Sequence, residues 1–212
     1  MSDWQKRYQR LLFDRPHPKV LRVTMNRPEE LNPLDWDTVR ALDRVFGELA
    51  ADPAVRVVAV TGAGRAFSAG GDMKKYQKLQ RDPTDFPQFL ADIHAMFLRI
   101  GEYPKPYVAL VNGVSVAGGT ELILSCDFAI AGESARIGDA HLPFGQMGGG
   151  GVLTLLPRAI GPIDKRISSA DGISCRSVGF CAGGVAACPA VMRISERPKS
   201  PTATGTMPMP SA

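Results

Sequence analysis

The chain lacks any apolar stretch near the roughly 18 residues that a membrane-spanning helix needs, so we expect no transmembrane segment. Its first residues lack the charged-then-apolar form of a secretory signal, and we therefore expect a cytoplasmic protein. Cysteine is scarce, with four in 212 residues, and the spacing of the last three shows no paired metal-ligand pattern. Because a reducing compartment disfavours disulfides, we expect none. The formal charge of +4 is spread along the chain, which suits an anionic small molecule at least as well as nucleic acid.

Leucine and cysteine are unevenly distributed along the chain. No leucine follows Leu156, and three of the four cysteines (Cys175, Cys181 and Cys188) lie in the last quarter. The average of 44% hydrophobic and 22% charged residues is that of a globular protein, but it describes two different segments. We therefore expect one ordered domain over residues 1–163 and an aberrant, disordered tail over residues 164–212.

The first of these segments alternates strands and helices. Apolar patterns predict strands over residues 11–13, 20–25, 55–61 and 107–111, the first two forming a hairpin across residues 15–18. Helical spacing of apolar residues predicts helices over residues 36–49, 85–100 and 119–126. The repeated order of strand, glycine turn and helix indicates an α/β fold with functional groups at the strand-to-helix turns.

Two glycine-rich turns follow the two buried strands, over residues 66–73 and 112–122. Backbone N–H groups at the start of a helix are unpaired and carry partial positive charge. Two such turns can aim two amides at one oxygen, which is how an oxyanion hole is built. For either turn alone, the simpler interpretation is that its glycines only permit a tight bend.

Taken together, the two turns resemble the crotonase superfamily, that is, the enoyl-CoA hydratase/isomerase family. The motifs are FSAGGD at residues 67–72 and NGVSVAGGTE at residues 112–121, with further agreement at residues 26–34, 105–106, 131–138 and 156–161. The resemblance implies an α/β fold, the ClpP/crotonase-like spiral of ββα units, and an acyl-CoA thioester as ligand. In that family, two backbone amides hold the thioester oxygen while an enolate forms.

The resemblance also implies roles for individual residues. It places the oxyanion-hole amides at Ala69 and Gly118, and it makes Glu121 a catalytic acid and base. Without the glycine context, a glutamate in the first turn of a helix would be explained by the helix dipole alone. The expected substrate-binding residues are Arg27, Leu31, Ser68, Gly70, Asp72 and Gly149.

His141 marks a departure from the family pattern, because hydratases carry their second catalytic glutamate there. Histidine can donate and accept protons near neutral pH, but the two-carboxylate mechanism does not transfer intact. Asp139 would supply the missing carboxylate if its side chain pointed inward, although a strand or loop residue at this place is more often directed to solvent.

Several other residues have simpler interpretations. Lys74, Lys75 and Lys78 could meet CoA phosphates, but a solvated helix face is the simpler interpretation. His94 is expected to be a surface or packing residue, and Cys126 a packing residue in an apolar helix.

We expect hydration of a 2-enoyl-CoA, with Glu121 as acid and base. The alternatives are an enoyl-CoA isomerase or acyl-CoA hydrolase that uses Glu121 with His141. An inactive acyl-CoA-binding fragment is an alternative of another class, since the family's C-terminal helical region is absent from the sequence. We expect no metal and no cofactor, because coenzyme A is part of the substrate, and neither nucleic acid nor membrane as a partner. The family would imply a homotrimer or hexamer, although those contacts use the C-terminal helices.

The tail suggests its own explanation. The family leads us to expect a Leu-Leu-Thr-Gly segment soon after residue 161, and the sequence has none. Dropping one base from possible codons of residues 170–172 gives Leu-Thr-Gly, and residues 184–190 shift similarly toward a Trp-containing family segment. Our hypothesis is a frameshift after about residue 165; the alternative is a divergent short member with a disordered tail. A gene whose other frames yield no crotonase-like C-terminus would exclude the frameshift.

Overall fold

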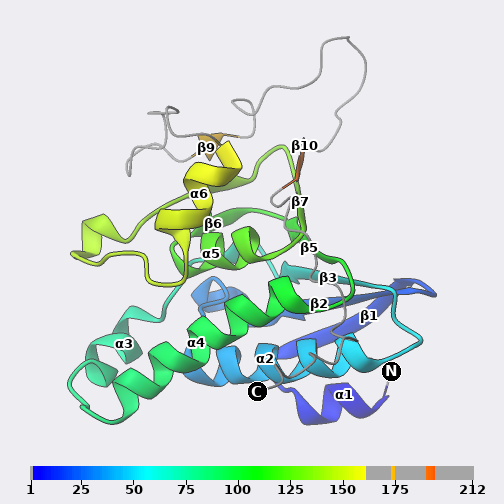
Figure 1. Ribbon diagram of the computed structural model, residues 1–212, viewed down its shortest axis with the longest axis horizontal. Helices are drawn as coiled ribbons and strands as arrows, with labels where there is room; N and C mark the ends of the chain where they lie inside the picture. Colours follow the sequence, from blue (N-terminus) through cyan, green and yellow to red (C-terminus); the bar gives the residue numbers. More distant parts are fainter. Residues whose placement is uncertain (1, 161–172, 175–189, 194–212) are drawn as a thin grey trace, which may run out of the picture.

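The computed structural model describes residues 2–160, 173–174 and 190–193 (Figure 1). The remainder of the expected tail over residues 164–212 lies outside the described residues, as do Cys175, Cys181 and Cys188. The helices are α1 (Ser2–Arg7), α2 (Trp36–Ala51), α3 (Met73–Leu79), α4 (Asp85–Glu102), α5 (Gly118–Ser125) and α6 (Val152–Ile160). Two 3-10 turns are η1 (Pro28–Glu30) and η2 (Leu142–Phe144). No helix in the described part of the chain is both long and apolar enough to cross a bilayer.

The strands form two sheets. The larger has the order β1-β2-β3-β5-β7-β10, from β1 (Leu11–His17), β2 (Val20–Met25), β3 (Val57–Gly62), β5 (Tyr107–Val111), β7 (Phe128–Ala131) and β10 (Ala190–Arg193). Strands β2, β3, β5 and β7 run parallel, whereas β1 and β10 pair antiparallel at the edges. The smaller sheet has the order β4-β6-β8-β9, from β4 (Ala66–Ser68), β6 (Val114–Val116), β8 (Arg136–Gly138) and β9 (Ile173–Ser174).

Successive units of the chain follow one plan. The pairs β3–β4, β5–β6 and β7–β8 each give one strand to the larger sheet and the next strand to the smaller sheet, and a helix follows each pair. Strands β3, β5 and β7 pair in parallel in the larger sheet, and β4, β6 and β8 pair in parallel in the smaller sheet. The turn that follows the second strand of each pair therefore lies in the same region of the molecule. This arrangement confirms the predicted α/β spiral of ββα units.

Most sequence-predicted elements are present at nearly the predicted positions. The strand over residues 107–111 matches β5, and the three predicted helices match α2, α4 and α5 within two residues at each end. The hairpin is also present, but β1 continues through His17 and the chain turns at Pro18 and Lys19 rather than across residues 15–18. Strands β4, β6 and β8 of the smaller sheet have three residues each, which is too short for an apolar pattern, and the sequence did not predict them.

Helices α2 and α4 cover one face of the larger sheet, where they lie side by side (Figure 1). The apolar stripe of α2 is fully buried, including Leu42 and Phe46, and the Tyr107 hydroxyl donates a 2.6 Å hydrogen bond to the Phe46 carbonyl. Helix α2 begins at a side-chain cap, since Asp35 accepts a hydrogen bond from the Thr38 amide at 3.0 Å. This packed layer is the base on which the glycine turns and α5 are held.

Candidate active site

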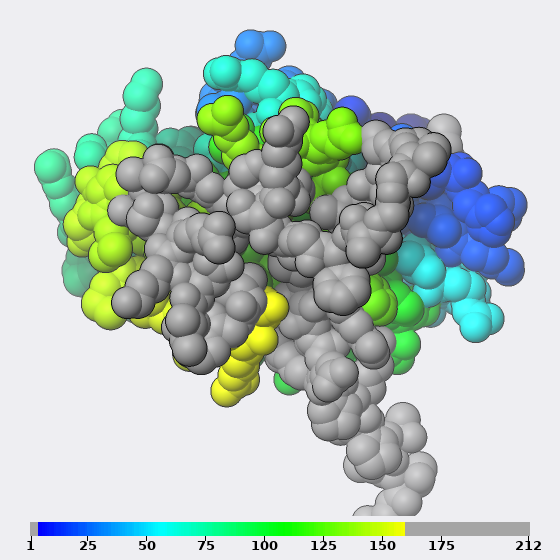
Figure 2. All heavy atoms as spheres, turned by 90° about the horizontal axis from the view of Figure 1, so that it is seen from above, coloured from blue at the N-terminus to red at the C-terminus, as the bar shows by residue number. Residues whose placement is uncertain are grey.

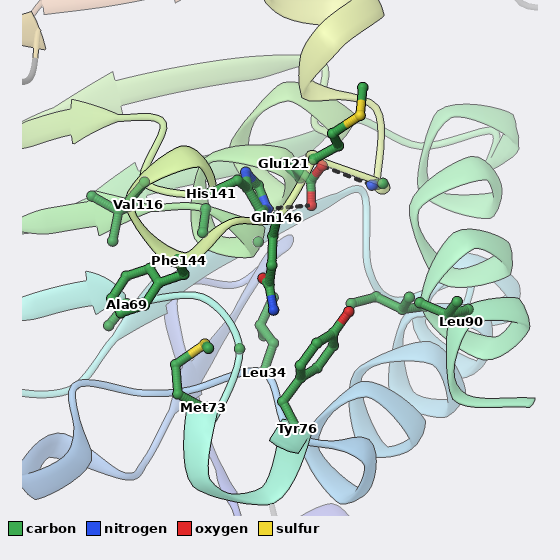
Figure 3. Close-up of a pocket in the computed structure, with 18 of the residues that line it drawn as sticks. Leu34, Ala69, Met73, Tyr76, Leu90, Val116, Glu121, His141, Phe144 and Gln146 are labelled. Atoms are coloured by element: carbon green, nitrogen blue, oxygen red, sulfur yellow. Dashed lines mark hydrogen bonds and ion pairs between the residues drawn. The ribbon is translucent and has the colours of Figure 1, made fainter. Parts of the chain in front are cut away.

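A cavity of about 520 Å³ lies where the two glycine turns meet (Figure 3). Its walls come from α3, α4, the start of α5 and the segment of residues 140–150. Figure 2 shows the yellow-green segment that contains η2 at the same end of the molecule as the teal segment that contains α3. The walls are mainly apolar, with a few polar side chains: Tyr76, His94, Glu121, His141 and Gln146. A mostly apolar cleft with few polar groups is the usual form of a small-molecule site.

The backbones of the two turns approach each other at Gly70 and Gly118. A Cβ atom added to Gly118 would lie 3.6 Å from the Cα atom of Gly70. A Cβ atom added to Gly70 would lie 2.8 Å from the Ala117 Cβ, and Gly70 has a φ of +82°, so glycine is required there. This contact joins two turns that are far apart in the sequence.

The hydrogen bonds of the turns decide which amides are available. The Ala69 N–H donates to the Leu31 carbonyl at 2.9 Å, and the Gly70 N–H donates to the Ser68 hydroxyl at 3.2 Å. The expectation that Ala69 contributes to an oxyanion hole is therefore wrong for this conformation. Gly71 and Gly118 line the cavity, and their N–H groups have no hydrogen-bond partner among the described residues.

Glu121 lies in the first turn of α5 and is 3% exposed. Its Oε1 atom accepts hydrogen bonds from the amides of Gly150 at 2.7 Å and Val152 at 3.4 Å, where α6 begins. Its Oε2 atom faces the His141 ring, 3.9 Å from Nε2 (Figure 3). One carboxylate oxygen is thus fixed by backbone donors, and the other is directed to the imidazole.

His141 is 8% exposed and lines the cavity next to Glu121. Asp139 does not line the cavity; its Oδ1 atom is 2.5 Å from Nδ1 of His141 and also accepts the His141 backbone N–H at 3.1 Å. The Asp139 side chain therefore points neither to solvent nor into the cavity in place of a glutamate, as the sequence considerations had allowed. It is bound to the histidine instead.

A second cavity adjoins the first and shares Ala69, Gly71 and Met73 with it. Its other walls carry charged side chains: Arg27, Glu30, Asp72, Lys74 and Lys75. The expected substrate residues Arg27 and Asp72 are thus brought together, and their side chains lie 3.7 Å apart.

Asp35, the side-chain cap of α2, is ion-paired with two of these charged side chains, Arg27 and Lys75. It forms ion pairs with Arg10 and Arg27, each at 2.8 Å, and with Lys75 at 2.5 Å. Burial opposes ionisation of Asp35, but hydrogen bonds from Lys75 and Thr38 and the Arg10 charge outweigh it and lower its pKa to about 2. The interpretation of the lysine cluster as only a solvated face is therefore wrong for Lys75.

The remaining expected substrate residues divide into two groups. Gly149 lines the first cavity, as expected. Leu31, Ser68 and Gly70 line neither described cavity; they hold the first turn through the bonds given above, and Ser68 also donates to the Asn32 carbonyl at 2.8 Å. Their placement supports a role in shaping the turn rather than in contacting a ligand.

Some site residues were not found from the sequence. Tyr76 and His94 line the cavity from α3 and α4, but an isolated aromatic or histidine on an amphipathic helix carries no signal of that. Cys126 is a buried packing residue as predicted, and burial raises the pKa of its thiol. Within the described residues, no group of three or more histidine, cysteine, aspartate or glutamate residues is placed to hold a metal ion.

Comparison with known proteins gives a consistent result. The family model for enoyl-CoA hydratase/isomerase matches residues 16–167. The short-chain-enoyl-CoA hydratase of Clostridium acetobutylicum is 37% identical over 144 residues, covering 68% of this chain and 54% of that protein.

Solved structures agree with the sequence matches. The enoyl-CoA hydratase of Bacillus anthracis superposes with a TM-score of 0.72 and 31% identity, covering 79% of this chain and 66% of that one. The enoyl-CoA hydratase of Thermoplasma volcanium superposes with a TM-score of 0.67 and 29% identity, covering 74% and 61%. The chain spans 54–58% of the length of the curated relatives that it matches.

Proposed function

The chain belongs to the enoyl-CoA hydratase/isomerase family, and on this premise we propose that it adds water to the double bond of a 2-enoyl-CoA thioester. The observation that carries the proposal is the pair of buried side chains, Glu121 and His141, facing each other at 3.9 Å beside two amides that have no hydrogen-bond partner in the described part of the chain. Hydration requires these groups: an acceptor for a proton of water, a donor to carbon, and a site for the negative charge that develops on oxygen.

The thioester oxygen binds to the N–H groups of Gly71 and Gly118. Both amides belong to fixed turns, so they need no reorganisation when charge develops on the oxygen. Removal of one donor from such a site typically lowers the rate about 10²- to 10³-fold.

The proton steps use Glu121 and His141. The Oε2 carboxylate oxygen of Glu121 takes a proton from water as the water oxygen bonds to C3, and the C2–C3 π electrons move into the enolate. The proton then passes from Glu121 to the Nε2 atom of His141, 3.9 Å away, and Nε2 delivers it to C2, which restores the thioester. Both side chains return to their starting states, and the net change is the addition of one water molecule.

The second cavity would take the anionic part of coenzyme A. Lys74 and Lys75 lie in its wall, and Arg27 adds a third cation. Arg27 is already paired with Glu30, Asp35 and Asp72, so Lys74 is the cation best placed to meet a phosphate.

Glu121→Gln tests the proposal, with crotonyl-CoA as substrate. The amide keeps a carbonyl oxygen for the Gly150 N–H but cannot take a proton, so we expect the hydration rate to fall about 10²- to 10⁴-fold. Glu133→Gln, in the exposed turn before β8, is the matched control and should keep the wild-type rate. Equal rates for wild type and Glu121→Gln would remove Glu121 from the mechanism.

Isomerisation is the second candidate, because His141 occupies the place of the second carboxylate. Glu121 could remove a proton from C2 of a 3-enoyl-CoA and His141 could deliver one to C4, with the same amides holding the enolate. Product analysis separates the outcomes: a 3-hydroxyacyl-CoA indicates hydration, a shifted double bond isomerisation, and a free thiol hydrolysis. Binding of the thioester without turnover would indicate an acyl-CoA-binding protein.

We also propose that residues 1–163 form the acyl-CoA domain. We further propose that the protein self-associates, as the family would imply. Reading the other frames of the gene would test the proposed origin of residues 164–212. Light scattering of the purified chain would test self-association, and a monomer at every concentration would contradict it.

A further inference from the structure

We propose that Asp139 is a positioning residue that keeps a proton on Nδ1 of His141 and so presents an unprotonated Nε2 atom to Glu121. Asp139, His141 and Glu121 then form a series of carboxylate, imidazole and carboxylate, in place of the two catalytic carboxylates of the hydratase pattern. Its role in a reaction rests on the proposed function, whereas the tautomer of His141 can be measured independently.

The hydrogen bonds of Asp139 carry this inference. Its Oδ1 atom accepts both the His141 backbone N–H at 3.1 Å and the Nδ1 contact at 2.5 Å. A carboxylate can only accept hydrogen bonds, so the proton between Oδ1 and Nδ1 belongs to the imidazole. The attachment at two points fixes both the backbone and the ring of His141 relative to one oxygen.

Packing holds the ring in the same orientation. The His141 side chain is 10% exposed, and a Cβ atom added to Gly148 would lie 3.1 Å from Nδ1 and 3.2 Å from Cε1. The absence of a side chain at Gly148 therefore leaves the space that the ring fills. With Nδ1 bound to Asp139, the remaining ring nitrogen is directed at Oε2 of Glu121, 3.9 Å away.

This geometry has a chemical consequence. Neutral imidazole has one N–H and one bare nitrogen, and only the bare nitrogen can accept a proton. With Nδ1–H held by Asp139, Nε2 is free to take the proton that Glu121 removes from water, and the imidazolium so formed lies between two carboxylates. Asp139 neither gains nor loses a proton in the cycle; it selects the tautomer, as the buried aspartate does in the Ser-His-Asp triad.

Nitrogen-15 NMR of the imidazole rings tests the tautomer directly. The chain has three histidines, so the signals of His141 can be assigned by their loss in His141→Gln. We expect a protonated Nδ1 and an unprotonated Nε2 in the neutral wild-type ring, and a loss of that preference in Asp139→Asn. An Nε2–H tautomer in the wild type would overturn the proposal.

Steady-state kinetics with crotonyl-CoA tests the consequence. Asp139→Asn should lower kcat at least about tenfold and leave KM within about twofold, because the substrate-binding surfaces are unchanged. Asp14→Asn, an exchange of the same type at a β1 side chain that is paired with Arg22, should keep both parameters. An unchanged kcat in Asp139→Asn, alongside a large loss in His141→Gln, would overturn the role of Asp139.

The two measurements separate the two proposals. If neither the wild type nor any variant hydrates crotonyl-CoA while the Nδ1–H tautomer depends on Asp139, the proposed function fails and the positioning of His141 stands. If the wild type hydrates crotonyl-CoA and the tautomer does not depend on Asp139, the proposed function stands and the positioning role of Asp139 fails.

Discussion

Neighbouring backbone amides of the first glycine turn differ in whether their N–H groups are already hydrogen-bonded. Gly71 and Ala69 are two residues apart, yet the Ala69 N–H is bonded to Leu31 while that of Gly71 has no partner among the described residues. We expect Gly71→Pro, which removes the N–H, to lower the hydration rate about 10²- to 10³-fold. Gly71→Ala keeps the N–H, and its Cβ would meet nothing within 4 Å, so its rate should stay near that of the wild type. Equal losses in both variants would contradict the role of the amide.

The charge on Asp35 makes stability depend on pH. Its pKa is about 2 in the folded protein, below that of an unfolded aspartate, so ionised Asp35 stabilises the fold above about pH 4 and this contribution is lost as the pH falls toward 2. Asp35→Asn should lower the free energy of unfolding by about 2 kcal/mol near pH 7. The gap between wild type and variant in urea titrations should narrow as the pH is lowered from about 4 to 3. Asp14→Asn breaks an exposed ion pair with Arg22 and should hardly change the free energy of unfolding. If the stability difference between wild type and Asp35→Asn stayed constant with pH, the charge on Asp35 would not be its origin.

At the scale of elements, α5 depends on its close approach to β4. A Cβ atom added to Gly119 would press on the Ser68 carbonyl oxygen and lie 2.9 Å from the Ser68 Cβ. Because the backbone of β4 cannot move easily, Gly119→Ala should destabilise the protein by about 1–3 kcal/mol, measured by urea unfolding. Gly71→Ala, in open space, is the control and should be near neutral. A stable Gly119→Ala variant would show that α5 can shift away from β4.

At the scale of the whole molecule, the protection of backbone amides from hydrogen exchange should follow the strand order of the larger sheet. Strands β3 and β5 have hydrogen-bonded neighbours on both sides, whereas β1 is an edge strand. We expect the amides of β3 and β5 to exchange with deuterium most slowly, because their opening requires the core to open. Faster exchange in β5 than in β1 would contradict this order.

The sequence by itself determined much of this protein. The order of strands and helices followed from apolar periodicity, because the spacing of buried side chains is a local property of each element. The glycine turns and Glu121 were also evident, since a motif of small residues before a helix is written in the chain itself. These features predicted an α/β fold, and the resemblance of the two turns to the crotonase superfamily implied the spiral of ββα units.

Only the tertiary structure decided the finer points. Whether the N–H of Ala69 or of Gly71 is available depends on a hydrogen bond to Leu31, a residue far away in the sequence. The smaller sheet has strands too short for periodicity, and the pairing of Lys75 with Asp35 joins two distant segments. The same holds for His141, because Glu121 comes close to its ring only when α5 and the turn after β8 pack against each other. Backbone direction and side-chain orientation are set by such distant partners, and no local pattern records them.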